Sequence, residues 1–324
     1  TNEGRYVSWY DFACEIFRQA DLPVTVLPVT TAEYSLSTAA RPFNSRLDKA
    51  KLVENGFECF EITFGESTRA FSLPDMAAKI RDALGNSGAV ISTLGVYANV
   101  LDGTGIHADA LRSMEECIDS AHLFGCNIVS CFAGRVPGAS VEDSLPRFKE
   151  VFGPLVERAK DRGVRLALEN CAMGDSWKSG GWNIAINPTA WEMLFNEIPD
   201  SALGLEWEPA HQLTALIDPI PQLRKWAQKV HHVHGKDATI AWDVIRECGI
   251  NSPAAFRWDR TPGFGDSNWS DIITILRMNG YRGTIDIEGY HDPVYSNPNW
   301  EWTSQLRGLE YLKQCRGGGR ELIL

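Results

Sequence analysis

The 324-residue chain is 44% hydrophobic and 23% charged, the balance of an ordinary globular protein, which excludes a disordered or collagen-like chain. No run reaches the roughly 18 unbroken apolar residues of a membrane helix. The N-terminal residues show no basic region before an apolar run, so we expect no signal peptide and no membrane partner. The net charge of −11 argues against a nucleic-acid partner, whose binding needs a basic face. The eight cysteines form no C-x-x-C pair, which predicts reduced, buried thiols in a cytoplasmic protein.

Short apolar runs alternate with helix-periodic segments along the chain, after a leading helix predicted over about 8–20. The predicted strands are 23–30, 57–63, 88–95, 127–133, 164–168, 202–207, 230–234 and 283–288. The predicted helices between and after them are 46–55, 74–84, 107–124, 144–162, 188–197, 219–228, 269–279 and 300–314. This alternation predicts parallel strands with crossover helices. The count of eight favours an α/β fold of the (β/α)8 TIM-barrel type, as one domain over 1–324.

Local signals support the ends of several helices. Asn187 before Pro188 is typical of a helix start, and Gly125 and Gly163 follow helical runs where a left-handed helix end favours glycine. The segment at about 237–268 is longer than the other connections and rich in Trp, Pro and Gly. We expect it to be a loop insertion after a strand, which in a barrel lies on the face where active sites form.

The last four predicted strands end in charged or metal-binding side chains. They supply Glu169; then Glu206, Glu208 and His211; then His231, His232, His234, Lys236 and Asp237; and finally Asp286, Glu288 and His291. A buried strand does not tolerate an ionised carboxylate without a partner, so carboxylates converging on one barrel mouth call for a cation. Three carboxylates and one imidazole form a mixed oxygen and nitrogen donor set. Such a set indicates Mn²⁺ or Mg²⁺ rather than a zinc ion bound by thiolates.

The series LALEN, GLEWEPAH, HHVHGKD and GTIDIEG resembles the xylose-isomerase-like family of sugar isomerases and epimerases, over about residues 20–315. The family has a (β/α)8 barrel with a Glu in E-N on the fifth strand. It has D-x-x-H on the sixth strand, H-x-K-D on the seventh and a Glu on the eighth. The order of all four motifs is specific, whereas any one of them alone is weak.

The resemblance implies one divalent metal ion per chain, held by Glu169, Glu208, His234 and Glu288. Mn²⁺ is the expected ion, with Mg²⁺, Co²⁺ or Zn²⁺ as alternatives. This sequence departs from the family pattern twice. Glu208 stands where Asp is usual, which lengthens that ligand by one methylene, and Cys171 stands where members often have His.

The chemistry of such a site can be outlined from its groups. A bound cation polarises a carbonyl, and two carboxylates beside the substrate then act as acid and base. The resemblance assigns those roles to Glu169 and Glu288. The candidate substrate-binding residues are His211, Arg260, Lys236 and Trp177. Lys236 can equally neighbour a helix cap, and Arg260 can be an ordinary surface residue. Because side chains alternate along a strand, His232 should face the same way as His234, and His231 the opposite way.

The leading hypothesis is a metal-dependent sugar isomerase or epimerase that removes a proton alpha to the carbonyl of a keto-sugar. The alternative resembles the catalytic subunit of C-glycoside deglycosidases, a lyase that eliminates the aglycone from a 3-keto-glycoside and works with a smaller second subunit. The sequence has no phosphate-binding loop, so a non-phosphorylated sugar or glycoside is the expected partner. The resemblance also implies a homo-oligomer. Two other classes remain open: a DNA-repair enzyme resembling endonuclease IV, and a sugar-binding subunit without turnover.

Overall fold

The computed structural model describes residues 14, 17–18, 49–289, 291–297 and 300–317. The chain divides into two units, residues 1–48 and residues 49–324. Residues 14, 17 and 18 of the first unit are helical. The rest of the helix predicted over 8–20 and the whole strand predicted over 23–30 lie outside the described residues. The single domain predicted over 1–324 therefore stays a prediction.

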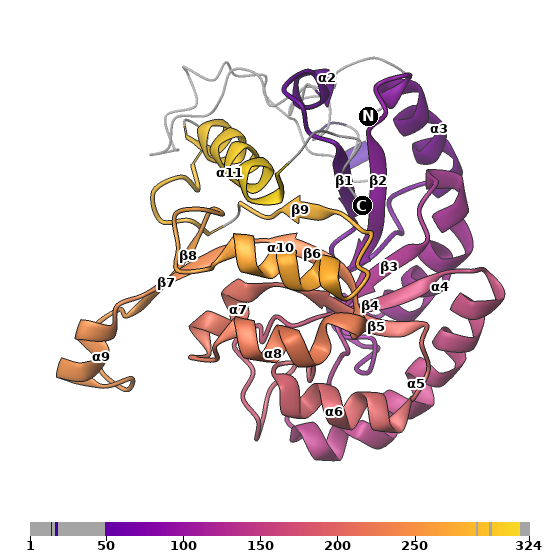
Figure 1. Ribbon diagram of the computed structural model, residues 1–324. Coiled ribbons are helices and arrows are strands. Elements are labelled where there is room, and N and C mark those ends of the chain that lie inside the picture. Colours follow the sequence, from indigo (N-terminus) through magenta and orange to yellow (C-terminus); the bar gives the residue numbers. More distant parts are fainter. Residues whose placement is uncertain (1–13, 15–16, 19–48, 290, 298–299, 318–324) are drawn as a thin grey trace. The chain divides into compact units, whose positions relative to one another are not determined.

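The second unit is built around a sheet of parallel strands, shown in Figure 1. Its strands are β1 (Cys59–Thr63), β2 (Val90–Val96), β3 (Ile128–Cys131), β4 (Arg165–Glu169), β5 (Leu203–Trp207), β6 (Val230–Gly235) and β9 (Ile285–Ile287). They are paired in that order, and every pair is parallel. The two outer strands come together where the Cys59 thiol lies 3.8 Å from the carbonyl oxygen of Ile285. The fold is thus the predicted TIM barrel, with these strands nearly closing it.

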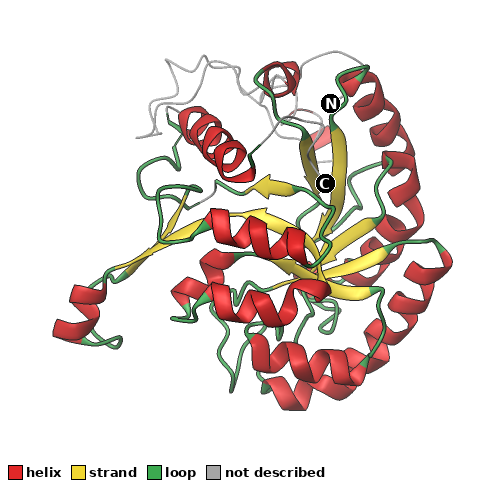
Figure 2. Cartoon of the chain, in the orientation of Figure 1, coloured by secondary structure: helices red, strands yellow, loops and turns green. Residues whose placement is uncertain are grey.

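Helices follow the strands in the predicted alternation and cover the outside of the sheet (Figure 2). They are α2 (Lys49–Glu54), α3 (Leu73–Leu84), α4 (Ala110–Ser120), α5 (Val141–Asp161), α6 (Pro188–Glu197), α8 (Pro219–Trp226), α10 (Trp269–Met278) and α11 (Glu301–Arg316). Short elements that the sequence did not predict are η1 (Gly105–His107) and α7 (Pro209–Thr214), while η2 (Ala121–Phe124) extends α4 and η3 (Ala227–Lys229) extends α8. Across the described residues, we find no helix with the length and apolar character needed to cross a bilayer.

The predicted helix ends are confirmed where the structure describes them. The Asn187 side chain accepts a hydrogen bond from the backbone N–H of Ala190 at 3.0 Å, and Pro188 opens α6. Gly125 ends η2 in the left-handed conformation with φ 74°, which a side-chain-bearing residue adopts only at a cost. These caps set the points at which the chain leaves a helix and enters the next strand.

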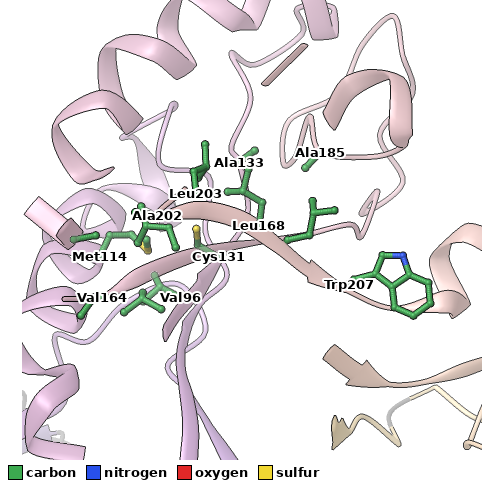
Figure 3. Packing of buried hydrophobic residues seen from close by; sticks show 14 of the residues in the cluster. Val96, Met114, Cys131, Ala133, Val164, Leu168, Ala185, Ala202, Leu203 and Trp207 are labelled. Atoms are coloured by element: carbon green, nitrogen blue, oxygen red, sulfur yellow. The ribbon is translucent and has the colours of Figure 1, made fainter. Parts of the chain in front are cut away.

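The hydrophobic core fills the space between the strands and the helices. Figure 3 shows Val96, Cys131 and Leu168 of three neighbouring strands, together with Met114 of α4 and Trp207 at the end of β5. All five are buried, as expected for parallel strands that are covered on both faces. The eight cysteines are free thiols, and three of them are buried.

The segment predicted as a loop insertion over 237–268 contains secondary structure of its own. Strands β7 (Asp237–Ile240) and β8 (Arg257–Arg260) form an antiparallel pair, with α9 (Trp242–Cys248) between them. This arm extends away from the parallel strands, with α9 at its far end (Figure 1). No residue of α9 is buried, so periodicity against a core gave the sequence no signal for this helix.

We predict that Asn187→Ala lowers the free energy of unfolding by about 1 kcal/mol, because it removes the acceptor for an N–H that has no partner within the helix. Urea unfolding followed by circular dichroism measures the change. Glu192→Ala in the same helix is the control, since the Glu192 side chain is 58% exposed and pairs only with a surface lysine. Equal effects of the two substitutions would contradict a capping role.

Candidate metal centre

The ends of four parallel strands bring together the residues predicted as metal ligands. Glu169 is the last residue of β4 and His234 lies in β6, while Glu208 and Glu288 directly follow β5 and β9. One ligand atom from each of the four lies within 4.8 Å of the others. Parallel strands present their carboxyl ends at one end of the barrel, so residues far apart in sequence converge there.

Several polar atoms of this cluster are buried and make no well-aligned hydrogen bond in the described part of the chain, although His211 Nε2 contacts Glu208 Oε1. They are both carboxylate oxygens of Glu208, Nδ1 of His234 and Oε2 of Glu288. His234 Nδ1 lies 3.5 Å from Glu169 Oε1 and 3.4 Å from Glu288 Oε2, without a hydrogen bond to either. Buried polar atoms without partners are rare and costly. Three carboxylates and one imidazole nitrogen form a donor set that fits a divalent cation.

The pKa values of several clustered groups depart from their usual values because several carboxylates are buried close together. Burial raises the pKa of Glu169 to about 7. Burial also opposes ionisation of Glu288, but the Lys236 ammonium and His234 outweigh it and hold the pKa of Glu288 well below its usual range. Burial disfavours a charged His234, yet Glu206 and Glu61 raise its pKa well above the usual value. Lys236 and His234 thus favour the ionised form of Glu288, whereas burial disfavours the ionised form of Glu169.

Two of the predicted substrate-binding residues border the cluster. The buried Lys236 places its Nζ 2.8 Å from Glu288 Oε1 and 4.0 Å from Glu208 Oε1. His211, in the first turns of α7, lies with its Nε2 against Glu208 Oε1. The side chain of Glu288 is 28% exposed and that of His211 is 16% exposed. These residues thus mark the side from which solvent reaches the cluster.

The other two predicted substrate-binding residues are engaged elsewhere. Arg260 lies in β8, where its Nε donates to Asp292 at 3.3 Å. The Trp177 indole N–H donates to Glu142 at the start of α5, at 2.7 Å. In the described part of the chain, neither residue forms a hydrogen bond or ion pair with the four predicted ligands. A substrate contact by Arg260 or Trp177 therefore stays a prediction.

Two asparagines fix the backbone that carries the carboxylates. Asn170 donates from its amide to the carbonyl of Glu208 at 3.0 Å and accepts from the N–H of Glu208 at 2.8 Å. Asn183 donates to the carbonyl of Glu169 at 2.9 Å. Asn170 is the second residue of the E-N motif, so here it ties the end of β4 to the end of β5.

Asp237, the last residue of the H-x-K-D motif, anchors the arm. Its buried carboxylate accepts hydrogen bonds from the backbone N–H groups of Ala238, Ser267 and Gly263 at 2.8, 3.0 and 3.3 Å. Asp237 thus closes the segment at both ends, and its motif partner His234 faces the cluster on the other side of β6.

A second buried cluster lies beside the first and was only partly predicted. His232 lies between two carboxylates, with Nδ1 2.7 Å from Glu206 Oε1 and Nε2 2.9 Å from Asp286 Oδ2. It therefore faces inward, as expected from the alternation along β6. His231 faces the other way and bonds the carbonyl of Leu166 at 3.0 Å, which confirms that prediction. Glu61 was missed, although a carboxylate within an apolar strand such as CFEIT is a signal for an inward polar role.

The structure is a parallel barrel with carboxylates and a histidine that could hold a metal ion gathered at the carboxyl ends of its strands. The family model of the xylose isomerase-like TIM barrel matches residues 50–315, and the chain belongs to that family. A model of the RmlD substrate binding domain also matches residues 1–65, too short a stretch to assign a family.

Individual relatives are more distant. The chain is 29% identical over 131 residues to inosose dehydratase from Clostridium beijerinckii, which covers 39% of this chain and 42% of that enzyme. The chain therefore spans less than half the length of this curated relative. Among solved structures, D-psicose 3-epimerase has a TM-score of 0.62 at 15% identity, covering 83% of this chain and 92% of that chain. The 3-keto-D-glucoside 4-epimerase from E. coli has a TM-score of 0.59 at 15% identity, covering 81% and 91%. At such identities the structures show a shared fold.

We predict that Asp237→Ala detaches the arm while the parallel strands stay folded. The substitution leaves the buried N–H groups of Ala238 and Ser267, and the less buried one of Gly263, without their charged acceptor, at a cost of about 3 kcal/mol. Limited proteolysis should then cut within 241–256 much faster than in the parent protein, with little loss of far-ultraviolet circular dichroism. Unchanged cleavage would show that Asp237 does not anchor the arm.

Proposed function

We propose that the protein is a divalent-metal-dependent enzyme that removes a proton alpha to the carbonyl of a keto-sugar, as a sugar isomerase or epimerase. The observation that carries the proposal is the convergence of ligand atoms from Glu169, Glu208, His234 and Glu288 within 4.8 Å of one another, several of them buried without a hydrogen bond in the described part of the chain. Glu169, Glu208, His234 and Glu288 would hold the ion, and Mn²⁺ suits their mixed oxygen and nitrogen set. Membership of the xylose isomerase-like family supports the same assignment.

A bound divalent ion supplies Lewis-acid polarisation of the substrate carbonyl, which acidifies the neighbouring C–H. The remaining work falls to side chains of this chain. The carboxylates of Glu169 and Glu288 are the candidates to take a proton from carbon and to return one, because both stand at the cluster and Glu288 is partly open to solvent. His211 and Lys236 are placed to hold substrate hydroxyl groups at the same opening.

A second version of this chemistry is elimination. Removal of the same proton from a 3-keto-glycoside can be followed by loss of the aglycone, as in a C-glycoside deglycosidase-like lyase. The similarity to an enzyme named inosose dehydratase favours this alternative, since a dehydratase is itself an eliminating enzyme. In this version the chain would be the catalytic subunit of a hetero-oligomer. A homo-oligomeric assembly and a cytoplasmic location also remain proposals.

We predict that the protein loaded with Mn²⁺ incorporates solvent deuterium into its substrate. The test incubates it in D₂O with free ketohexoses and with 3-keto-glycosides and follows products by mass spectrometry. Deuterium at C3 of a ketose together with a new epimer supports the epimerase, and release of the aglycone supports the lyase. Glu169→Gln is the control and should lower exchange by about 10²–10⁴-fold while the fold is kept. Exchange that survives this substitution would refute the acid–base assignment.

We predict that His234→Ala lowers bound manganese, because it removes the nitrogen donor of the set. The variant and the parent protein are stripped with a chelator, reloaded with Mn²⁺, dialysed and analysed by plasma mass spectrometry. His122→Ala is the matched control, since His122 is exposed and lies in η2. Equal manganese in all three proteins, with unchanged circular dichroism, would place the metal elsewhere.

A further inference from the structure

The second buried cluster differs from the first in that both carboxylate oxygens of Glu61 and of Glu206 have polar partners. Glu61 Oε2 lies 2.7 Å from His234 Nε2, and Glu61 Oε1 lies 2.5 Å from the Tyr97 hydroxyl. The same hydroxyl lies 2.7 Å from Glu206 Oε2, and Glu206 Oε1 lies 2.7 Å from His232. Four groups of this cluster come close enough together to be considered as metal ligands. Because the Glu61 and Glu206 carboxylates and the His232 ring already have close polar partners, we interpret the cluster as a support for its neighbour.

The link between the two clusters is the imidazole ring of His234. Its Nε2 faces Glu61, and its Nδ1 faces Glu169 and Glu288. A histidine that binds a metal through one nitrogen keeps a hydrogen on the other, and the acceptor of that hydrogen fixes both the tautomer and the ring orientation. Glu61 accepts at Nε2, which leaves the Nδ1 lone pair directed into the first cluster.

The position of Glu61 is itself fixed from several strands. Tyr97 directly follows β2 and joins Glu61 of β1 to Glu206 of β5. A Cβ atom on Gly95 would overlap both the Glu61 carboxylate and the Tyr97 ring, so the glycine leaves the space that these two side chains share. The side chain of Glu61 is only 10% exposed. Its carboxylate therefore has little freedom to leave His234.

We propose that Glu61 is a positioning residue for the metal centre. It acts through His234, by accepting the Nε2 hydrogen and so holding Nδ1 toward Glu169, Glu208 and Glu288. This inference rests on the proposed function, because it requires a metal at those ligands. It assigns to β1 a role in a centre whose ligands all come from β4, β5, β6 and β9.

Two substitutions at Glu61 test the role through metal affinity. Leucine has a similar size and cannot accept a hydrogen bond, so Glu61→Leu should weaken Mn²⁺ binding by about 10–100-fold. Glutamine keeps an acceptor oxygen for His234 and an amide for Tyr97, so Glu61→Gln should stay within a few-fold of the parent protein. The dissociation constant is measured by electron paramagnetic resonance of free Mn²⁺ during titration. Thr68→Val is the control, since it removes a buried hydroxyl that bonds Ser113 outside both clusters.

The possible results distinguish a failure of the positioning role of Glu61 from a failure of the proposed metal-dependent function. Weak binding by Glu61→Leu with recovery in Glu61→Gln supports positioning by Glu61, because a general loss of packing would not be rescued by an amide. Parent-like affinity in a folded Glu61→Leu variant overturns it. If Glu61→Leu does not fold, Glu61→Asp replaces it, since the shorter carboxylate no longer reaches Nε2 and must show the same loss. A parent protein that binds no Mn²⁺ overturns the proposed function and, with it, this inference.

Discussion

Carboxylates buried at the mouth of the barrel are the constraint on which the rest of the site depends. Glu169, Glu208 and Glu288 are drawn together because each stands at the carboxyl end of a parallel strand. Like charges in a buried site repel and lose hydration, and a site of this kind holds only if cations or protons compensate them. Lys236 and His234 provide part of that compensation. Carboxylate oxygens of Glu208 and Glu288 make no hydrogen bond in the described part of the chain, and we propose that a divalent ion completes the compensation there.

Hydrogen bonds from the surrounding structure hold the carboxylates in place against their mutual repulsion. Asn170 and Asn183 hold the backbone at two ligands, and Asp237 holds the arm that begins beside a third. Below them, the hydrogen bonds from Glu61 through Tyr97 and Glu206 connect strands on different sides of the barrel. The ordered core of Figure 3 provides the rigid frame against which these bonds act. A metal centre needs such a frame, since its ligands must be held close to the coordinating geometry before the ion arrives.

The barrel could be predicted from sequence because buried parallel strands give continuous apolar runs and the crossover helices give a 3.6-residue period. A metal site at the strand ends could be proposed because charged side chains end the last four apolar runs, and the resemblance to the xylose-isomerase-like family then implied Glu169, Glu208, His234 and Glu288 as the ligands. The hydrogen-bond partners of these residues could not be predicted from the sequence. Glu61 and Tyr97 lie far from the others in sequence, and only closure of the barrel brings them to His234. Helix α9, between β7 and β8, buries no residue, so it left no periodic signal in the sequence.

The measurement that tests the central claim most directly is anomalous diffraction from a manganese-soaked crystal, recorded above and below the manganese absorption edge. The account predicts one anomalous peak per chain, bounded by oxygens of Glu169, Glu208 and Glu288 and by Nδ1 of His234. A peak among Glu61, Glu206 and His232 would contradict it, because it would show that the paired cluster is the metal site. No peak at either cluster at saturating Mn²⁺ would equally contradict it.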